Sequence, residues 1–150
     1  TIRSLVRGGD VRNVSALLGN DYSIQGTVLH GAGDGKSIGI PTANLLPENA
    51  DKIIPANGVY AGWAECEGVV RPGVISVGPR PTFNKPGESI EIHIPGYSGD
   101  LYGKRMRIGF ISRLRGIVKF DSSDALVRQI QKDIEDSRRF NALSLRLKKE

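Results

Sequence analysis

The ten residues from Gly35 to Asn44, which read Gly-Lys-Ser-Ile-Gly-Ile-Pro-Thr-Ala-Asn, could act on a phosphate group. Gly35 and Gly39 leave the backbone bare enough to approach a phosphate closely. Pro41 then stiffens the chain before Thr42 and Asn44, whose oxygen-bearing side chains suit a hard cation. The pattern is not a Walker P-loop, because no Gly-Lys-Ser/Thr follows the second glycine. The segment indicates a nucleotide site, although its glycines alone would favour a turn-rich loop between strands.

A second candidate for chemistry is Glu91, which lies in the alternating run from Ile90 to Ile94. Side chains alternate between the faces of a strand, so the isoleucines share one face while Glu91 and His93 project from the other. A carboxylate placed in this way can accept a proton from an alcohol, as a general base does. By spacing alone, an ordinary glutamate on a solvent-facing strand is the commoner case, and both interpretations stay open.

The chain offers little for other reaction classes. Its histidines, His30 and His93, lack the His-Glu-x-x-His or Cys-x-x-Cys neighbours of a zinc site, and no Gly-x-Ser-x-Gly elbow is present. Neither a transition-metal enzyme nor a hydrolase is therefore expected. His30 stands at the end of an expected strand, where it either contacts a nucleotide or is an ordinary polar residue.

Length and cysteine count narrow the class of protein. The 150 residues suffice for one domain with a real core, and a single cysteine, Cys66, excludes an intrachain disulfide. No apolar run approaches the ~20 residues that span a bilayer and no signal peptide is evident, so we expect a cytoplasmic protein. We interpret Cys66 as a small buried residue.

The net charge of +5 suits a small anionic substrate such as ATP as well as a nucleic acid. Aromatic residues make up only 6% of the chain and are not interleaved with basic ones, as a base-stacking surface requires. Nucleic acid is therefore not expected as a partner. A solvated helix face is the expected role of the basic residues near the C-terminus, among them Arg128, Lys132, Arg138 and Arg139.

The hydrophobic pattern predicts short helices in residues 1–19, with Asp10 capping the second of them. One apolar face of that helix is formed by Val11, Val14, Leu17 and Leu18. Strands are predicted at Tyr22–Val28, Val59–Cys66, Val69–Val77, Ser89–Ile94 and Lys104–Ile111. Glu67 and Gly68 would form a hairpin turn. Punctuated by glycine and proline, these runs favour an antiparallel barrel over βαβ units.

A helix is predicted after Phe120, where Asp121-Ser122-Ser123-Asp124 can cap its start. Its apolar face, packed on the barrel, is expected to contain Leu126, Val127, Ile130 and Ile134. Further apolar residues continue the stripe with a shifted phase, which predicts a bend or break near Ser137.

Several short blocks in a fixed order give the chain a resemblance to a known family. The segment Gly35 to Asn44 resembles the signature of the riboflavin kinases, especially the C-terminal kinase module of bacterial bifunctional FAD synthetases. The other matching blocks are Gly58-Val59-Tyr60-Ala61, Val77-Gly78 with Pro81-Thr82-Phe83, Ile90-Glu91-Ile92-His93, Asp100-Leu101-Tyr102-Gly103, and Leu114-Arg115 with Lys119-Phe120.

This resemblance implies a mainly β fold, a six-stranded antiparallel Greek-key barrel with a C-terminal α-helix and short N-terminal helices. It also implies Mg2+-dependent transfer of the γ-phosphoryl group of ATP to riboflavin, which gives FMN and ADP in FAD biosynthesis. Residues 20–150 would form the kinase domain with its C-terminal helix. Residues 1–19 would be a helical linker, similar to the segment that joins the two modules of the bifunctional enzyme.

The same resemblance assigns roles at the reacting centre. Glu91 matches the glutamate that acts as the base on the ribityl 5′-hydroxyl. Thr42 is assigned to Mg2+ through its loop hydroxyl, and Asn44 would support the metal and the phosphates.

Nucleotide contacts are implied for the rest of the first block. Backbone amides between Gly35 and Gly39 would cradle the phosphates, with Pro41 in the same segment. Lys36 stands where the family usually has arginine, so it keeps the charge but loses bidentate geometry. His30 would contact the nucleotide from the strand end before this block.

Three more side chains receive roles by resemblance. Tyr102 would help to wall the adenine side, and Phe83 belongs to a segment similar to the family's flavin side. Arg115 would be a charged contributor to flavin binding. Ile117 departs from the family, which commonly has an acidic residue there.

The sequence begins at Thr1 rather than Met, which suggests a fragment or a processed chain. In the parent protein we expect a covalently joined N-terminal FMN adenylyltransferase module, and this chain has no His-x-Gly-His motif for that reaction. The alternative from another class is a non-catalytic barrel that binds flavin or single-stranded nucleic acid. Glu91 separates the two, because a binding protein does not need it.

Overall fold

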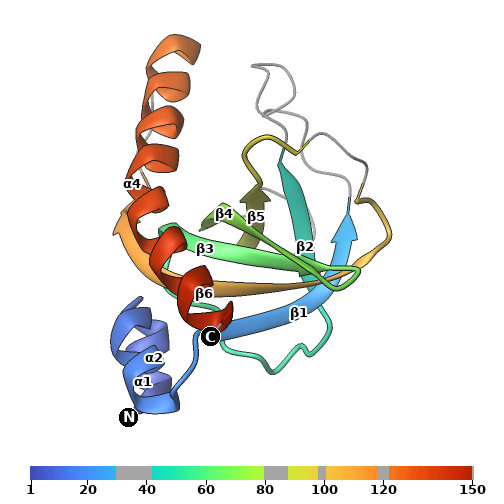
Figure 1. The fold of residues 1–150 in the computed structure, drawn as a ribbon, viewed down its shortest axis with the longest axis vertical. Coiled ribbons are helices and arrows are strands. Elements are labelled where there is room, and N and C mark those ends of the chain that lie inside the picture. The colour runs from blue at the N-terminus through green and yellow to red at the C-terminus, as the bar shows by residue number, and fades with distance from the viewer. Residues whose placement is uncertain (30–41, 80–87, 98–100, 118–121, 150) are drawn as a thin grey trace.

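The computed structural model describes residues 1–29, 42–79, 88–97, 101–117 and 122–149, and the side chains of 88, 123 and 141–149 lie outside this description (Figure 1). The strands are β1 (Tyr22–Leu29), β2 (Ala43–Pro47), β3 (Gly58–Cys66), β4 (Val69–Pro79), β5 (Glu88–His93) and β6 (Arg105–Arg115). The helices are α1 (Ile2–Arg7), α2 (Val11–Leu18) and α4 (Ser123–Lys149). No helix within the described ranges is both long and apolar enough to cross a bilayer.

The six strands close into an antiparallel barrel in the order β1-β2-β5-β4-β3-β6. β3, β4 and β5 are consecutive in the chain and are neighbours in the sheet. The next strand, β6, returns to lie beside β3, and the preceding strand, β2, lies beside β5, which is a Greek-key arrangement. Closure pairs each of these six strands on both sides, so none of the described strands is a free sheet edge. The predicted fold, a six-stranded barrel with a C-terminal helix and short N-terminal helices, is confirmed.

One strand, β2, has no counterpart among the runs predicted from the residue pattern. Its sequence is Ala-Asn-Leu-Leu-Pro, in which Leu45 is buried and Leu46 is 49% exposed. Backbone pairing with β1 on one side and β5 on the other makes it a strand. Asn44 therefore lies within a strand rather than in a loop, and Thr42 directly precedes that strand.

The barrel interior is filled by the inward side chains of the alternating strands. At most 3% of the surface is exposed at Ile24, Val28, Tyr60, Ile75, Ile90, Ile92, Met106, Ile108 and Phe110. Tyr60 and Phe110 meet edge to face, with ring centroids 5.2 Å apart. Cys66 is 4% exposed, and burial raises the pKa of its thiol, so its interpretation as a small buried residue is confirmed.

Helix α2 packs beside β1 and β6, and α1 packs against α2. Asp10 caps α2 as predicted, with Oδ1 accepting from the backbone N–H of Asn13 at 3.4 Å. Val11 and Val14 are buried, whereas Leu17 and Leu18 are 65% and 44% exposed. The last two leucines thus do not share the buried face, because they stand in the final turn, which the barrel does not cover.

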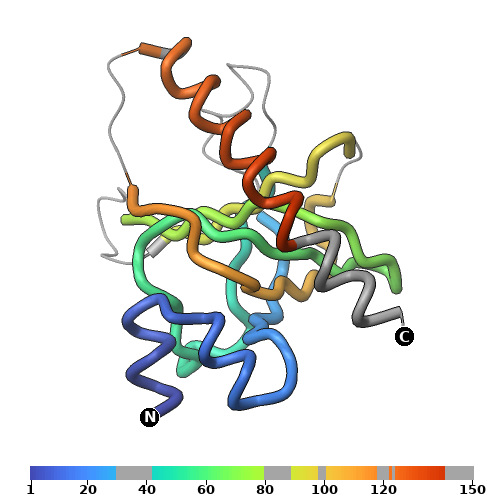
Figure 2. The backbone as a smooth tube through the Cα atoms, turned by 60° about the vertical axis from the view of Figure 1, so that its left-hand side comes forward, coloured from blue at the N-terminus to red at the C-terminus, as the bar shows by residue number. Residues whose placement is uncertain are grey.

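Helix α4 lies against the outside of the barrel, over β3, β4 and β6 (Figure 2). Ser122 caps it, its hydroxyl accepting from the backbone N–H of Ala125 at 3.2 Å. Of the bend or break predicted near Ser137, the break is wrong, because the helix continues to Lys149. The Ser137 hydroxyl donates to the carbonyl of Ile134 at 2.8 Å, which satisfies this polar side chain inside a continuous helix.

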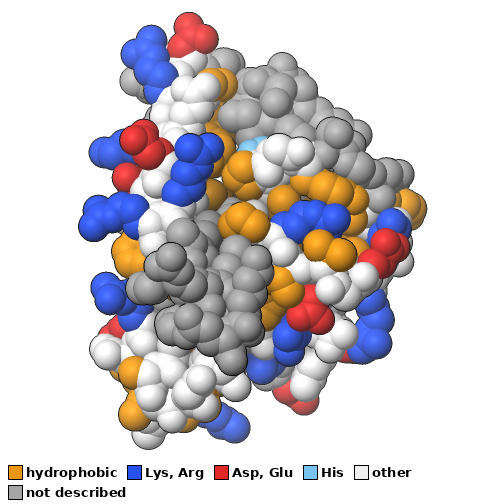
Figure 3. All heavy atoms as spheres, viewed as in Figure 1, with side chains coloured by type: hydrophobic (Ala, Val, Ile, Leu, Met, Phe, Trp, Pro, Cys, Tyr) orange, Lys and Arg blue, Asp and Glu red, His pale blue; other side chains and the backbone are white. Residues whose placement is uncertain are grey.

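Charged side chains stand along the outer side of α4, with lysines and arginines among aspartates and glutamates (Figure 3). The basic residues predicted to form a solvated face are exposed: Arg128, Lys132, Arg138 and Arg139. The net positive charge of the chain is therefore partly a property of this solvated helix surface.

Trp63 lies directly on the backbone of its cross-strand partner Gly109. Its indole N–H donates to Oδ2 of Asp21 at 2.8 Å, and the guanidinium of Arg107 lies 5.2 Å from the ring centroid. A Cβ atom added to Gly109 would lie 2.0 Å from the indole ring. The tryptophan thus requires glycine at position 109.

We expect Gly109→Ala to lower the free energy of unfolding by about 1–3 kcal/mol or more, because the added methyl group would overlap the ring of Trp63. Gly78→Ala is the matched control, since among the described residues a Cβ atom there would meet only Ile117, at 3.9 Å. Chemical denaturation of both variants measures the difference, and equal stabilities would contradict the contact.

Candidate functional site

The strand register aligns the candidate residues on the outside of the barrel. Direct cross-strand partners connect six residues around it, here called the outer row: Leu29, Asn44, Glu91, Ser76, Val59 and Arg115. Adjacent members stand one strand apart, a spacing of roughly 4.8 Å. The outer row brings three sequence candidates, Asn44, Glu91 and Arg115, onto one continuous surface.

Glu91 faces outward because its neighbours face inward. Ile90 and Ile92 are each 1% exposed in the barrel core, while Glu91 and His93 between and beside them are half-buried on the other face. The prediction that Glu91 and His93 project opposite the isoleucines is confirmed. The glutamate carboxylate is thus carried on a rigid central strand, paired on both sides.

Asn44 stands directly opposite Glu91 and is almost completely buried, with 9% of its surface exposed. The hydroxyl of Ser89 donates to its Oδ1 at 3.4 Å. Thr42, half-buried, comes two residues before Asn44. The sequence reasoning missed Ser89, whose place two residues before Glu91 on the same strand face could have indicated it.

Hydroxyl, amide and carboxylate oxygens thus occur together at the start of β2 and the middle of β5. Such donors suit a hard cation that keeps part of its water shell. In the described part of the chain, no group of three or more His, Cys, Asp and Glu residues could hold a metal. The oxygen set of Thr42, Asn44 and Glu91 is compatible with a weakly held Mg2+, and less so with a transition metal.

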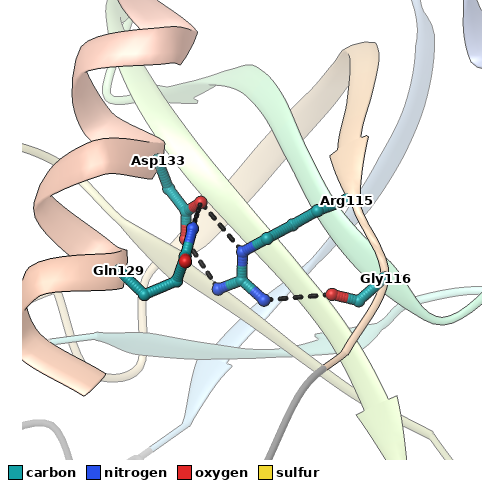
Figure 4. A network of polar contacts seen from close by, with 4 residues as sticks. All are labelled: Arg115, Gly116, Gln129 and Asp133. Atoms are coloured by element: carbon teal, nitrogen blue, oxygen red, sulfur yellow. Dashed lines mark hydrogen bonds and ion pairs between the residues drawn. The ribbon is translucent and has the colours of Figure 1, made fainter. Parts of the chain in front are cut away.

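Arg115 ends β6 and points toward α4 (Figure 4). Its Nε and Nη2 donate to Oδ1 and Oδ2 of Asp133 at 2.9 and 2.7 Å, and its Nη1 donates to the carbonyl of Gly116 at 3.0 Å. The Nε2 of Gln129 also donates to Oδ1 of Asp133, at 3.0 Å. The flavin contact proposed for Arg115 stays a prediction, while its guanidinium is held by a helix carboxylate.

Asp133 was not singled out from the sequence. It is 2% exposed and stands among Ile130, Ile134 and Ser137, on the side of α4 that faces the barrel. Its spacing in the sequence could have indicated this position. Asp133 comes three residues after Ile130 and four before Ser137, so it falls on the apolar face of the helix.

Tyr102 lies in a turn attached to the end of β1. The backbone N–H of Lys104 donates to the carbonyl of Leu101 at 3.1 Å, and Gly103 adopts a φ of 80°. The N–H of Gly103 donates to the carbonyl of Val28 at 2.8 Å. Tyr102, 52% exposed, therefore stands beside the strand end that carries Leu29 of the outer row.

The remaining sequence candidates lie outside the described residues: His30, Gly35, Lys36, Gly39, Pro41 and Phe83. Their roles stay predictions. Of the described residues next to them in the sequence, Leu29 belongs to the outer row and Thr42 comes two residues before Asn44.

A family model described as "Flavokinase: Riboflavin kinase" matches residues 18–141. Two similar curated proteins are the bifunctional riboflavin kinase/FMN adenylyltransferases of Bacillus subtilis (strain 168), 39% identical over 142 residues, and Haemophilus influenzae, 36% identical over 140 residues. Each comparison covers 93% of this chain and 45% of the relative, so the chain spans about half the length of these curated relatives.

Two solved structures are also similar. A Streptococcus pneumoniae protein described as a macrolide-efflux protein aligns with a TM-score of 0.86 at 35% identity, over 91% of this chain and 45% of that one. The riboflavin kinase of Trypanosoma brucei aligns with a TM-score of 0.53 at 26% identity, over 77% of this chain and 74% of that one.

Proposed function

Because the chain belongs to the riboflavin kinase family, we propose that it transfers the γ-phosphoryl group of ATP to the 5′-hydroxyl of riboflavin, giving FMN and ADP. The observation that carries the proposal is the cross-strand pair of Asn44 and Glu91 on the outer face of the barrel. In the proposal, Glu91 is the base, and Asn44, one strand away, binds the phosphates and the metal. The description of the Streptococcus protein names another activity, and the proposal rests instead on the family match and the bifunctional relatives.

Phosphoryl transfer requires mainly alignment of the two substrates and neutralisation of charge. Directly opposite residues of an antiparallel pair have Cβ atoms about 4.5–5.5 Å apart, so Glu91 and Asn44 can act on one reacting centre. Glu91 would accept the proton of the 5′-hydroxyl as that oxygen attacks the γ-phosphorus. Since β5 is paired on both sides, the backbone that carries Glu91 is held in place before the substrates bind.

Mg2+ is part of the proposal, and Thr42 and Asn44 would hold it together with the phosphates. The burial of Asn44 and its hydrogen bond from Ser89 fit this role, because a fixed amide oxygen needs no reordering on binding. When bound, the cation neutralises charge on the phosphate oxygens. The hydroxyl of Thr42 orients the same group from the chain before β2.

The segment between β1 and β2 would complete the nucleotide site. Backbone amides from Gly35 to Gly39 would cradle the phosphates, with Lys36, Pro41 and His30 as further contacts. Tyr102 would wall the adenine side. Its turn is hydrogen-bonded to β1, whose end at Leu29 pairs with Asn44.

On the flavin side, Phe83 and Arg115 remain the proposed contacts. In the alternative, a non-catalytic barrel that binds flavin or single-stranded nucleic acid, Glu91 would have no functional role. A half-buried carboxylate fixed opposite a buried amide favours the kinase.

We further propose that residues 20–150 form the kinase domain and residues 1–19 a helical linker. The family match begins at residue 18, which supports a boundary near α2. The curated relatives are bifunctional and more than twice as long as this chain. Their organisation supports a covalently joined adenylyltransferase module in the parent protein.

The 150-residue chain, incubated with riboflavin, ATP and Mg2+, should make FMN but no FAD, because the sequence contains no His-x-Gly-His motif. Chromatography of the products tests both statements. Absence of FMN would remove the proposed function, and FAD formed from FMN and ATP in material free of host enzymes would disprove the second statement.

Thr42→Ala should reduce turnover strongly and leave the fold intact, because the hydroxyl serves the metal and the phosphates rather than packing. Thr27→Ala is the matched control, since Thr27 is an equally half-buried threonine on β1. Steady-state kinetics at several Mg2+ concentrations measure the effect. Parent-like activity of Thr42→Ala at saturating Mg2+ would remove Thr42 from the metal role.

Glu91→Gln should lower kcat by roughly 10²- to 10⁴-fold, the usual contribution of a positioned general base. The amide keeps the volume and most hydrogen bonds, so both substrates should still bind and Tm should change little. Glu65→Gln, the same change at a partly exposed glutamate of β3, is the control. Unfolding of Glu91→Gln would make the residue structural, and turnover within a few-fold of the parent would exclude a catalytic base.

A further inference from the structure

A bidentate ion pair between Arg115 and Asp133 connects the end of β6 to α4. Arg115 donates from two nitrogens to both carboxylate oxygens of Asp133, a bidentate arrangement with directional specificity (Figure 4). The two side chains are 20% and 3% exposed. Gln129 adds a third donor to the same carboxylate, so Asp133 is held in turn by its own helix.

Stability alone does not account for this pair. Removing two charges from water costs about as much as their attraction returns, so a buried ion pair often stabilises no more than apolar residues would. Helix α4 already packs on the barrel, where Val59, Ala61 and Val74 are buried on its outer face. The specific effect of the pair is to fix the direction of Arg115.

Fixing Arg115 also fixes how the chain leaves the barrel. Its Nη1 holds the carbonyl of Gly116, and the next residue, Ile117, lies close to Gly78 of β4. Gly78 is the cross-strand partner of Ser89, the residue that donates to Asn44. The end of β6 thus approaches the same outer surface as Glu91, from the side of α4.

The order of the outer row separates the two substrates. Thr42 and Asn44 lie on the β2 side of Glu91, where the ATP phosphates and Mg2+ are proposed. In-line transfer places the attacking and leaving oxygens on opposite sides of the transferred group. The acceptor therefore belongs on the other side of Glu91, toward β4, β3, β6 and α4.

We propose that Asp133 is a positioning residue for the acceptor: through Arg115 it fixes Gly116 and Ile117 beside the acceptor site and thereby sets the affinity for riboflavin. Ile117, 45% exposed, offers an apolar side chain next to that site. This inference rests on the proposed kinase function. It gives α4 a role in substrate binding in addition to its packing on the barrel.

Asp133→Asn tests the inference, because it keeps the volume of the side chain and removes the charge that holds the guanidinium. The KM for riboflavin should rise roughly tenfold or more, because the loss of a hydrogen bond to a charged group changes an equilibrium constant by about this factor. The KM for ATP and the kcat at saturation should change little. Riboflavin binding in the presence of ADP and Mg2+, followed by flavin fluorescence, should weaken in parallel.

Glu65→Gln is the matched control, since it removes the carboxylate from Arg107, another arginine of β6, whose ion pair is exposed. It should behave as the parent. Gln129→Ala keeps both charged partners and removes one donor to Asp133, so it should raise the KM for riboflavin in the same direction by a smaller factor. This variant carries the test if Asp133→Asn does not fold.

Equal changes in kcat and in both KM values would reduce Asp133 to a structural residue and overturn the inference. A rise in the KM for ATP alone would place the network on the nucleotide side, also against it. Parent-like kinetics of both variants would exclude any positioning role. Failure of the parent chain itself to form FMN would overturn the kinase proposal and this inference together, an outcome distinct from the other three.

Discussion

The pairing of β2 with β5 is the constraint on which the candidate site depends. β2 is five residues long, yet it joins β1 to β5 and so closes the barrel. Its register places Asn44 opposite Glu91 and Leu45 opposite Ile90. A slip by one residue would turn every side chain of the strand to the other face, so that core packing and the site would be lost together.

Helix α4 covers only part of the outer surface of the barrel. Helix α4 covers β3, β4 and β6, where it buries apolar side chains together with the polar Asp133 and Ser137. The face carrying Asn44 and Glu91 lies beside this cover, and Leu29 pairs with Asn44 at its other side. The proposed kinase reaction must admit two substrates, one on each side of Glu91. This arrangement suits it, because Glu91 on β5 lies between the strands that α4 covers and β2.

Local chemistry predicted much of the fold. The alternation around Glu91, the cap at Asp10 and the hairpin at Glu67 and Gly68, both with positive φ, depend on interactions within a few residues, and all are found. The helix does not break at Ser137, whose hydroxyl is hydrogen-bonded to a carbonyl of the same helix. β2 was missed because its five residues do not alternate, and only pairing with two other strands makes them extended.

By itself, the sequence determined the family resemblance, the candidate base Glu91 and its outward direction, since the order of residue types and the period of a strand need no distant partner. Only the tertiary structure decided that Asn44 lies opposite Glu91 and that Ser89 holds it. It also decided that Arg115 is held by Asp133, eighteen residues further along the chain. These contacts come from strand register and helix docking, which depend on the whole closed barrel and cannot be derived from local spacing.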